Sequence, residues 1–208
     1  ENVEGLSWRP AAKMQAPGIT TVDLQNDGHP DLFVSGVLEL ESPGAETLTG
    51  NLVLQGREDG VFEAVDGHPL SGVSGVNATL WGDFDNDGLV DVYFCRRGLN
   101  QLWRQTTSGY WEDVTASTLT AGEDLDTVDG AFFDADHDGD LDLYLVNANG
   151  PDELLNNNLD GTFRPLAADF KLAGSEAESM MVLPADLDND LDADLIVLKR
   201  TPPHEIHI

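Results

Sequence analysis

Residues 81–94 read Trp81-Gly-Asp-Phe-Asp-Asn-Asp-Gly-Leu-Val-Asp-Val-Tyr-Phe94. This stretch places four carboxylates and a glycine within nine residues, between two apolar runs. The carboxylates stand at the first, third, fifth and ninth positions, and Gly88 at the sixth permits the sharp turn that lets them converge. Six or so oxygen ligands, including a backbone carbonyl at the seventh position, suit a hard cation such as Ca²⁺. The stretch therefore predicts a metal loop between two strands.

The same nine-residue phrase recurs three more times along the chain. Residues 134–142 keep every acidic position and the glycine. Residues 23–31 carry Gln25 at the third position, and residues 186–194 carry Leu191 in place of the glycine. Four copies at a regular interval indicate a repeat, so we interpret the loops as one structural device used four times.

The charge of the chain limits the partners it can have. The 208 residues carry a net charge of −29, from 10 Lys and Arg against 39 Asp and Glu. Binding to nucleic acid needs a basic surface, which this composition does not provide, so we exclude a nucleic acid partner. Much of the negative charge lies in the four loops, where bound cations would offset it. Folding is therefore expected to depend on metal.

Several features of the sequence bear on localisation. Cys95 is the only cysteine, so no disulfide can form within the chain. Loops of this kind with weak affinity fill where calcium is near millimolar, which favours an extracellular, cell-surface or periplasmic protein. No membrane span is visible. The chain begins with Glu1 and not with Met, as expected of a processed leader or of a piece cut from a longer protein.

The four loops begin 60, 51 and 52 residues apart, and the units between them can be laid over one another. A short apolar run enters each loop, a second leaves it, a third follows, and an Asp-Gly or Ser-Gly turn leads into a fourth. Each unit is thus predicted to be four antiparallel strands. The predicted first strands are 19–22, 78–81, 131–133 and 180–183, the second strands are 32–34, 92–94, 143–146 and 195–198, and the third strands are 51–55, 101–104 and 153–156.

A repeated four-stranded unit of this length is typical of a β-propeller blade. We predict an all-β fold, a β-propeller segment of four-stranded antiparallel blades. Three complete blades are expected at 18–77, 78–129 and 130–179, with partial blades at 1–17 and 180–208. No stretch rich in Pro, Gly or Ser marks an internal boundary, so residues 1–208 are interpreted as a single propeller domain or a fragment of one. A closed ring of about four to eight blades would need further chain or self-association.

Antiparallel alternation places the metal loops and the third-to-fourth hairpins on one face of the blades and the other connections on the opposite face. The longest of those connections, residues 35–50, is expected to be a binding loop, with an insertion of no function as the alternative. The acidic connection Glu123–Asp129 is expected on the same face, next to Ser175–Glu178. It can meet a cationic or metal-bridged ligand, and a solvated loop is the alternative.

The repeated unit is a strand, the loop Asp-x-Asp-x-Asp-Gly-x-x-Asp and a second strand, and it recurs every 50 to 60 residues. This unit resembles the FG-GAP repeat, also called the VCBS-type repeat, of integrin α-subunit propellers and many bacterial exoproteins. The resemblance covers nearly the whole chain. The phrases Trp111-Glu-Asp-Val-Thr115 and Asp160-Gly-Thr-Phe163 resemble the bacterial and cartilage-acidic-protein branch of that family.

The resemblance implies a Ca²⁺ in each loop, bound by side chains at positions one, three, five and nine and by the carbonyl at seven. For the two complete loops it implies the ligands Asp83, Asp85, Asp87, Leu89 (carbonyl) and Asp91, and Asp134, Asp136, Asp138, Asp140 (carbonyl) and Asp142. For the two imperfect loops it implies the weaker sets Asp23, Gln25, Asp27, His29 and Asp31, and Asp186, Asp188, Asp190, Asp192 and Asp194.

The imperfect loops are expected to bind more weakly for different reasons. Gln25 offers an amide oxygen but lacks the charge of Asp and is one methylene longer. Leu191 must adopt a positive φ if the turn is kept, which costs about 1 kcal/mol or more. The fourth site is therefore expected to be distorted or empty.

The loops have two alternative interpretations. An EF-hand requires a Glu at the twelfth loop position, and the four residues there are Val34, Phe94, Leu145 and Val197. Those apolar strand residues exclude it. Acidic turns solvated without metal remain the alternative to a metal site.

The sequence favours a calcium-binding propeller scaffold for extracellular adhesion or ligand binding. We expect the calcium to be structural and a protein or glycan ligand to bind on the face opposite the calcium loops. No catalytic residue is predicted, because the best carboxylate clusters are explained by metal. The alternatives are an accessory or catalytic propeller portion of a polysaccharide-degrading enzyme, for which paired carboxylates are the usual machinery, and a half-ring that self-associates.

Overall fold

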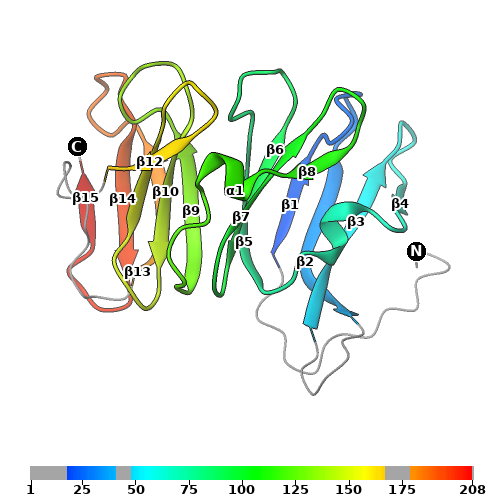
Figure 1. The fold of residues 1–208 in the computed structure, drawn as a ribbon, viewed down its shortest axis with the longest axis horizontal. Helices are drawn as coiled ribbons and strands as arrows, with labels where there is room; N and C mark the ends of the chain where they lie inside the picture. Colours follow the sequence, from blue (N-terminus) through cyan, green and yellow to red (C-terminus); the bar gives the residue numbers. More distant parts are fainter. Residues whose placement is uncertain (1–17, 41–47, 167–178, 208) are drawn as a thin grey trace. The chain divides into compact units, whose positions relative to one another are not determined.

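The computed structural model describes residues 18–40, 48–166 and 179–207 of the 208-residue chain. Within these residues the protein is all-β, with three four-stranded sheets and one three-stranded sheet (Figure 1). Contacts divide the chain into two compact units, Glu1–Asn77 and Ala78–Ile208. The division falls where the sequence places the boundary between its first two blades.

In the first unit the four strands follow one another as a meander, in the order β1-β2-β3-β4. Its elements are β1 (Ile19–Val22), β2 (Asp31–Leu40), β3 (Leu48–Gly56), β4 (Phe62–Ala64) and the 3-10 helix η1 (Pro69–Gly72). Asn51 in β3 connects the sheet to this helix, because its Nδ2 donates hydrogen bonds to the carbonyls of Leu70 (2.8 Å) and Val73 (2.9 Å).

The second unit contains three sheets with the orders β5-β6-β7-β8, β9-β10-β11-β12 and β13-β14-β15. Their elements are β5 (Val76–Gly82), β6 (Asp91–Arg96), β7 (Gln101–Gln105), β8 (Trp111–Asp113), α1 (Thr115–Thr118), β9 (Thr127–Phe133), β10 (Asp142–Asn147), β11 (Glu153–Asn157), β12 (Phe163–Pro165), β13 (Ser179–Ala185), β14 (Asp194–Lys199) and β15 (Glu205–His207). In every sheet the acidic loop joins the first strand to the second. The predicted all-β fold with blade-like sheets is confirmed.

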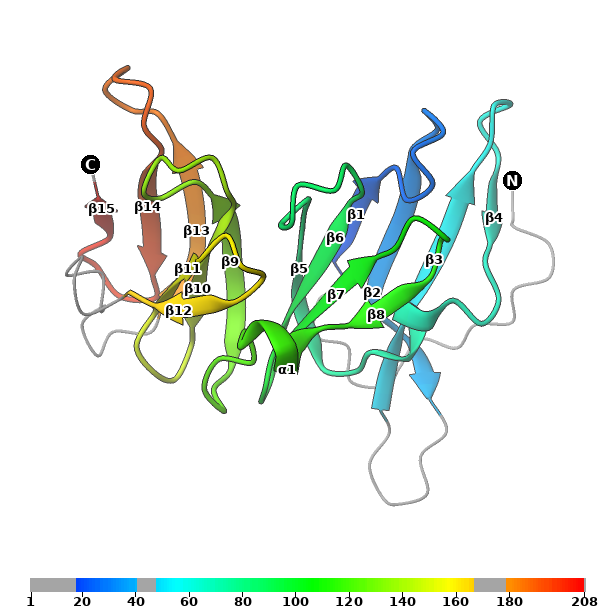
Figure 2. The same cartoon turned by 45° about the horizontal axis from the view of Figure 1, so that its top comes forward.

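The sheets of the second unit pack face to face, which explains why its second strands are apolar on both faces. Leu143 and Leu145 of β10 are buried in one cluster with Tyr93 and Leu102 of the β5–β8 sheet. Tyr144, the residue between them, points the other way into a cluster that includes residues of β13 and β14. Alternate residues of one strand therefore fill two cores, as period-two geometry requires. Figure 2 shows the three sheets from a second direction.

The structure differs from the sequence prediction in the connections. The prediction of a loop over residues 35–50 is wrong in part, because Leu38–Leu40 pair with Leu48–Gly50 and lengthen β2 and β3 beyond a register shift after Val34. The tail after residue 200 was not expected to contain a strand, yet β15 pairs with β14 from Leu195↔His207 to Val197↔Glu205. The short helices η1 and α1 were not predicted either.

Two sequence predictions lie outside the described residues. They are the partial blade at 1–17, and the acidic stretch Ser175–Glu178. No helix in the described part of the chain has the length and apolar character that crossing a membrane requires.

Candidate metal centre

The loop of residues 83–91 folds around the carboxylate of its first residue. Asp83 accepts hydrogen bonds from the backbone N–H groups of Asp87 (3.0 Å) and Gly88 (2.8 Å). The chain can make this tight turn because Asn86 has φ 56° and Gly88 has φ 85°, both in the left-handed region. Glycine adopts that region without strain and Asn does so more readily than most residues.

Asp91, the last residue of the loop, is buried and closes the loop onto the sheet. One carboxylate oxygen accepts the N–H of Phe84 (3.2 Å) and the other accepts the N–H of Gln105 (2.8 Å), at the end of the third strand β7. Asp91 is 0% exposed. Burial raises its pKa to about 7, against the opposing effect of the hydrogen bond from Gln105. A bound cation would offset the charge that burial makes unfavourable.

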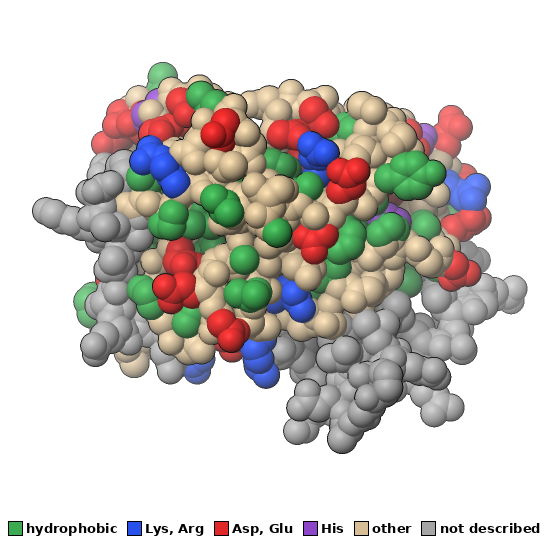
Figure 3. Space-filling model, viewed as in Figure 1, with side chains coloured by type: hydrophobic (Ala, Val, Ile, Leu, Met, Phe, Trp, Pro, Cys, Tyr) green, Lys and Arg blue, Asp and Glu red, His purple; other side chains and the backbone are tan. Residues whose placement is uncertain are grey.

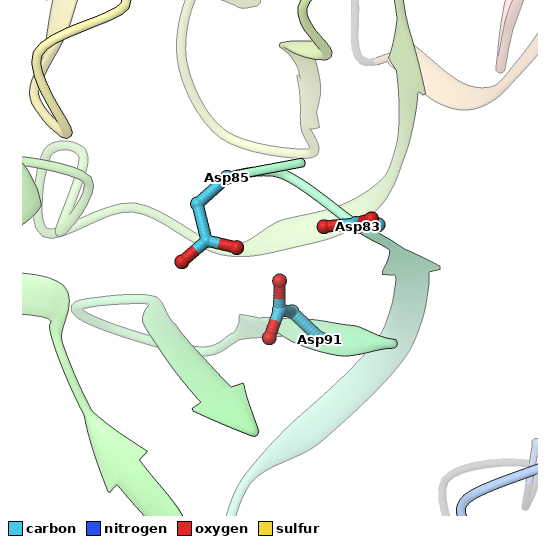
Figure 4. Close-up of side chains that lie close together, drawn as sticks. All are labelled: Asp83, Asp85 and Asp91. Carbon is cyan, nitrogen blue, oxygen red and sulfur yellow. The ribbon is translucent and has the colours of Figure 1, made fainter. Parts of the chain in front are cut away.

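Three carboxylates converge in this loop (Figure 4). Asp83, Asp85 and Asp91 each place an oxygen within 4.8 Å of the oxygens of the other two. Asp87 at the fifth position is not a member of this group, and its Oδ1 accepts the N–H of Leu89 (2.9 Å). The structure thus brings together three of the four predicted carboxylates, at positions one, three and nine.

The loop of residues 134–142 repeats these contacts. Asp134 accepts the N–H groups of Asp138 (3.2 Å) and Gly139 (3.1 Å). Asp142 accepts those of Ala135 (2.8 Å) and Asn157 (2.8 Å). Asp134, Asp136 and Asp142 form a second carboxylate group with the same spacing, and Asp138 again lies outside it and accepts the N–H of Asp140 (3.0 Å).

The fourth loop keeps its carboxylate group although it lacks the glycine. Asp186, Asp188 and Asp194 lie as close together as in the complete loops. Leu191 has φ 78°, as the sequence requires for a turn of this shape, and its N–H donates to Asp186 Oδ2 (3.2 Å). The Asp186 Oδ1 atom accepts the N–H of Asn189 (2.6 Å), one residue earlier than in the complete loops. Asp190 and Asp192 complete the loop outside the group.

The first loop has the same backbone contacts but fewer charges. Asp23 accepts the N–H groups of Asp27 (3.1 Å) and Gly28 (2.8 Å), and Asp31 accepts those of Leu24 (2.8 Å) and Gly56 (2.8 Å). Because Gln25 stands at the third position, Asp23 and Asp31 form no group of three carboxylates. At the seventh position, the backbone N–H of His29 donates a hydrogen bond to Asp27 Oδ1 (2.9 Å). The His29 side chain takes no part in these loop contacts.

The third strand supplies a neighbour to the third-position carboxylate that the loop sequence does not reveal. In the second loop, Arg104 Nη1 lies 3.7 Å from Asp85 Oδ2. In the third loop, Asn156 Nδ2 donates to Asp136 Oδ2 (2.8 Å). Arg104 brings a positive charge to one centre, and Asn156 brings only a hydrogen bond to the other.

Neighbouring loops of the second unit also contact each other. Asn86, at position four of its loop, donates from Nδ2 to Oδ1 of Asp140 (2.5 Å), at position seven of the next loop. His137, also at position four, places Nε2 3.3 Å from Oδ1 of Asp192, again at position seven. The same two positions are therefore used twice, and the residue contacted is the one whose carbonyl was predicted to bind metal.

The fold and the acidic loops define a class: an all-β repeat protein in which three of the four described sheets carry a group of Asp side chains that could hold a metal ion. A family model described as an FG-GAP-like repeat matches residues 23–94, 83–145 and 134–197. These matches together span residues 23–197, and the chain belongs to the FG-GAP-like repeat family. Among curated proteins, no match to the chain is found.

Proposed function

We propose that the protein is a calcium-binding scaffold in which each metal stabilises the junction between the first two strands of a blade. The observation that carries the proposal is the threefold recurrence of one carboxylate group, at positions one, three and nine of three loops. Hard carboxylate oxygens match the preference of Ca²⁺. Bound Ca²⁺ would supply the positive charge that three converging carboxylates lack. The fifth-position Asp and the seventh-position carbonyl are the further ligands we propose.

The ninth-position Asp links metal binding to folding. Asp91 and Asp142 already connect the loop to the end of the third strand through their two backbone hydrogen bonds each. A cation beside such a carboxylate would stabilise its ionised form, which is the form that accepts hydrogen bonds best. Metal affinity for the folded state alone appears as folding stability, about 2.7 kcal/mol per site at a free concentration of 100 times Kd.

We also propose an extracellular, cell-surface or periplasmic location and a role in adhesion or ligand binding without catalysis. Support comes from the calcium loops themselves, which fill readily only where calcium is abundant. The ligand is proposed to be a protein or glycan that binds at the ends of the blades away from the metal loops. In the second unit these ends carry the connections from second to third strands and from blade to blade, which include α1.

Calcium titration by calorimetry, together with thermal unfolding in calcium and in EDTA, tests the scaffold function. We expect three binding sites in the wild type and a marked fall in melting temperature on chelation. Asp134→Asn is expected to remove one site, because it takes away the carboxylate around which its loop folds. Asp160→Asn is the matched control, since Asp160 lies in a nearby hairpin and belongs to none of the three groups. An unchanged melt in EDTA would refute the proposal.

A further inference from the structure

A groove lies at the end of the second unit opposite its metal loops, with a volume of about 650 Å³. One wall is formed by α1 and the chain after it, from Thr115 to Glu123, and the other by residues 151–155 at the start of β11 and by Pro165 at the end of β12. In both ribbon views α1 lies between the β5–β8 sheet and the β9–β12 sheet (Figures 1 and 2). A volume between ~300 and ~1,000 Å³ is typical of ligand sites.

The lining of the groove combines apolar surface with negative charge. Its apolar side chains include Leu119 and Pro151. Among the residues that the structure describes, its charged side chains are Glu123, Asp152 and Glu153, and no Lys, Arg or His lines it. The face shown in Figure 3 has hydrophobic and acidic side chains next to each other in the region of α1. A ligand that fits this lining would be apolar with a positive charge.

The carboxylate of Asp152 is already hydrogen-bonded to other groups of the protein. Its Oδ1 accepts the N–H of Asn147 (3.0 Å), and its Oδ2 accepts hydrogen bonds from Ser179 Oγ (2.7 Å) and Tyr144 Oη (3.3 Å). It is 2% exposed. The charge available to a ligand therefore comes from Glu123 and Glu153.

Glu153 holds a carboxylate oxygen that has no partner. Its Oε2 is buried without a hydrogen bond within the described residues. The carboxylate packs against Gly122, where an added Cβ would lie 3.0 Å from Oε2. Burial raises the pKa of Glu153, and the negative charge of Glu123 raises it further. Neither glutamate forms an ion pair in the described part of the chain.

Leu119 presents an apolar side chain at the rim of the groove in a strained conformation. It follows α1 with φ 63°, a left-handed value that costs a residue other than Gly about 1 kcal/mol or more. Its side chain is nevertheless 66% exposed, so the strain is not offset by burial in the isolated chain. Strained residues of this kind are concentrated at sites that bind ligands.

We propose that this groove binds a segment of a partner protein that presents a lysine or arginine side chain between apolar residues. The basic group would lie between Glu123 and Glu153 and would offset the negative charge of the two carboxylates. The flanking apolar residues would cover Leu119 and Pro151. The proposal names the partner class for the ligand-binding face of the proposed scaffold, and so rests on that proposed function.

Selection from a random heptapeptide library on the immobilised full chain, in calcium, tests the proposal. We expect the enriched peptides to contain Lys or Arg beside apolar residues. Their affinity, measured by fluorescence anisotropy, should fall at least about tenfold for Glu123→Gln combined with Glu153→Gln, because each substitution keeps the shape and removes the charge. Asp124→Asn is the matched control, as it removes the same charge one residue from Glu123 but outside the lining. It should leave the affinity unchanged.

Three results would overturn the proposal: no enrichment, enriched peptides without a basic residue, or equal affinity for the wild type and the double variant. Thermal unfolding shows that each variant is folded. Calcium calorimetry on the same samples separates this inference from the scaffold function. Three calcium sites without peptide binding would contradict the groove alone, and absent calcium binding would contradict the scaffold.

Discussion

Replacing Leu191 by glycine should stabilise the protein, although it removes a large apolar side chain. Leu191 stands where the other three loops have glycine and has φ 78°. The side chain is 86% exposed, so little burial is lost with it. The left-handed conformation costs roughly 1–2 kcal/mol for a residue with a Cβ. Glycine also increases the conformational freedom of the unfolded chain, which lowers the stability of the folded state by about 0.5–1 kcal/mol. The difference predicts a gain of about 0.5–1 kcal/mol for Leu191→Gly.

Equilibrium unfolding by urea in EDTA measures this gain without a contribution from bound metal. The reciprocal control is Gly139→Ala, at the same position of the third loop. Gly139 has φ 94° and an added Cβ would meet no heavy atom within 4 Å, so any loss reports the backbone alone. We expect a loss of about 1 kcal/mol there. If Leu191→Gly left the free energy of unfolding unchanged or lower while Gly139→Ala lowered it, the argument from strain at Leu191 would be wrong.

Two further predictions concern contacts between side chains. Asn86→Ala removes the hydrogen bond to Asp140, and should weaken calcium binding in the next loop by about 0.5–1 kcal/mol in a calorimetric titration. Asn189→Ala, at the same position of the last loop, should not weaken calcium binding. Equal effects of the two substitutions would contradict the coupling between neighbouring loops. In the folded wild type, burial and the charge of Glu123 raise the pKa of Glu153, so the protein loses stability as the pH rises above 4.5, the ordinary pKa of Glu. Glu153→Gln removes this loss, and should therefore raise the melting temperature increasingly as the pH rises above 4.5. A difference between variant and wild type that is constant from pH 4 to pH 7 would refute it.

The repeated loop made most of the fold predictable from sequence. Each loop fixes where the first strand ends and the second begins, and the Gly turn does the same for the third and fourth. The strand β1 was predicted with its observed ends, Ile19–Val22. The strand β15 was missed because it has three residues, Glu205–His207, and follows a Pro-Pro pair, so no apolar run marks it. It is held by pairing with β14, which is a tertiary contact and not a local preference.

The candidate site was predictable in composition but not in the roles of its residues. Spacing alone treats the four acidic positions of a loop as equivalent ligands. In the structure Asp91 is buried and has two backbone hydrogen bonds, whereas Asp87 lies outside the carboxylate group. The difference arises from the N–H of Gln105, which is distant in sequence and comes from the third strand. The loop sequence therefore shows that position nine is acidic. Only the register of the sheet shows that this residue also connects the loop to the third strand.

The two complete loops have the same predicted ligand positions, but the third strand places different side chains beside them. In sequence, residues 83–91 and 134–142 share Asp at positions one, three, five and nine and Gly at position six, and the second loop has a further Asp, Asp140, at position seven. In the structure the third-position carboxylate of one lies 3.7 Å from the guanidinium of Arg104, and that of the other accepts a hydrogen bond from the neutral Asn156. A positive charge near a cation site competes with the cation for the carboxylate and repels it. Arg104 is also paired with Glu112 at 2.9 Å, so it is held close to the loop by the fourth strand. The loop of residues 134–142 should therefore bind calcium more tightly than its apparent equal, and the order of affinities is set by the strand beside each loop as much as by the loop itself.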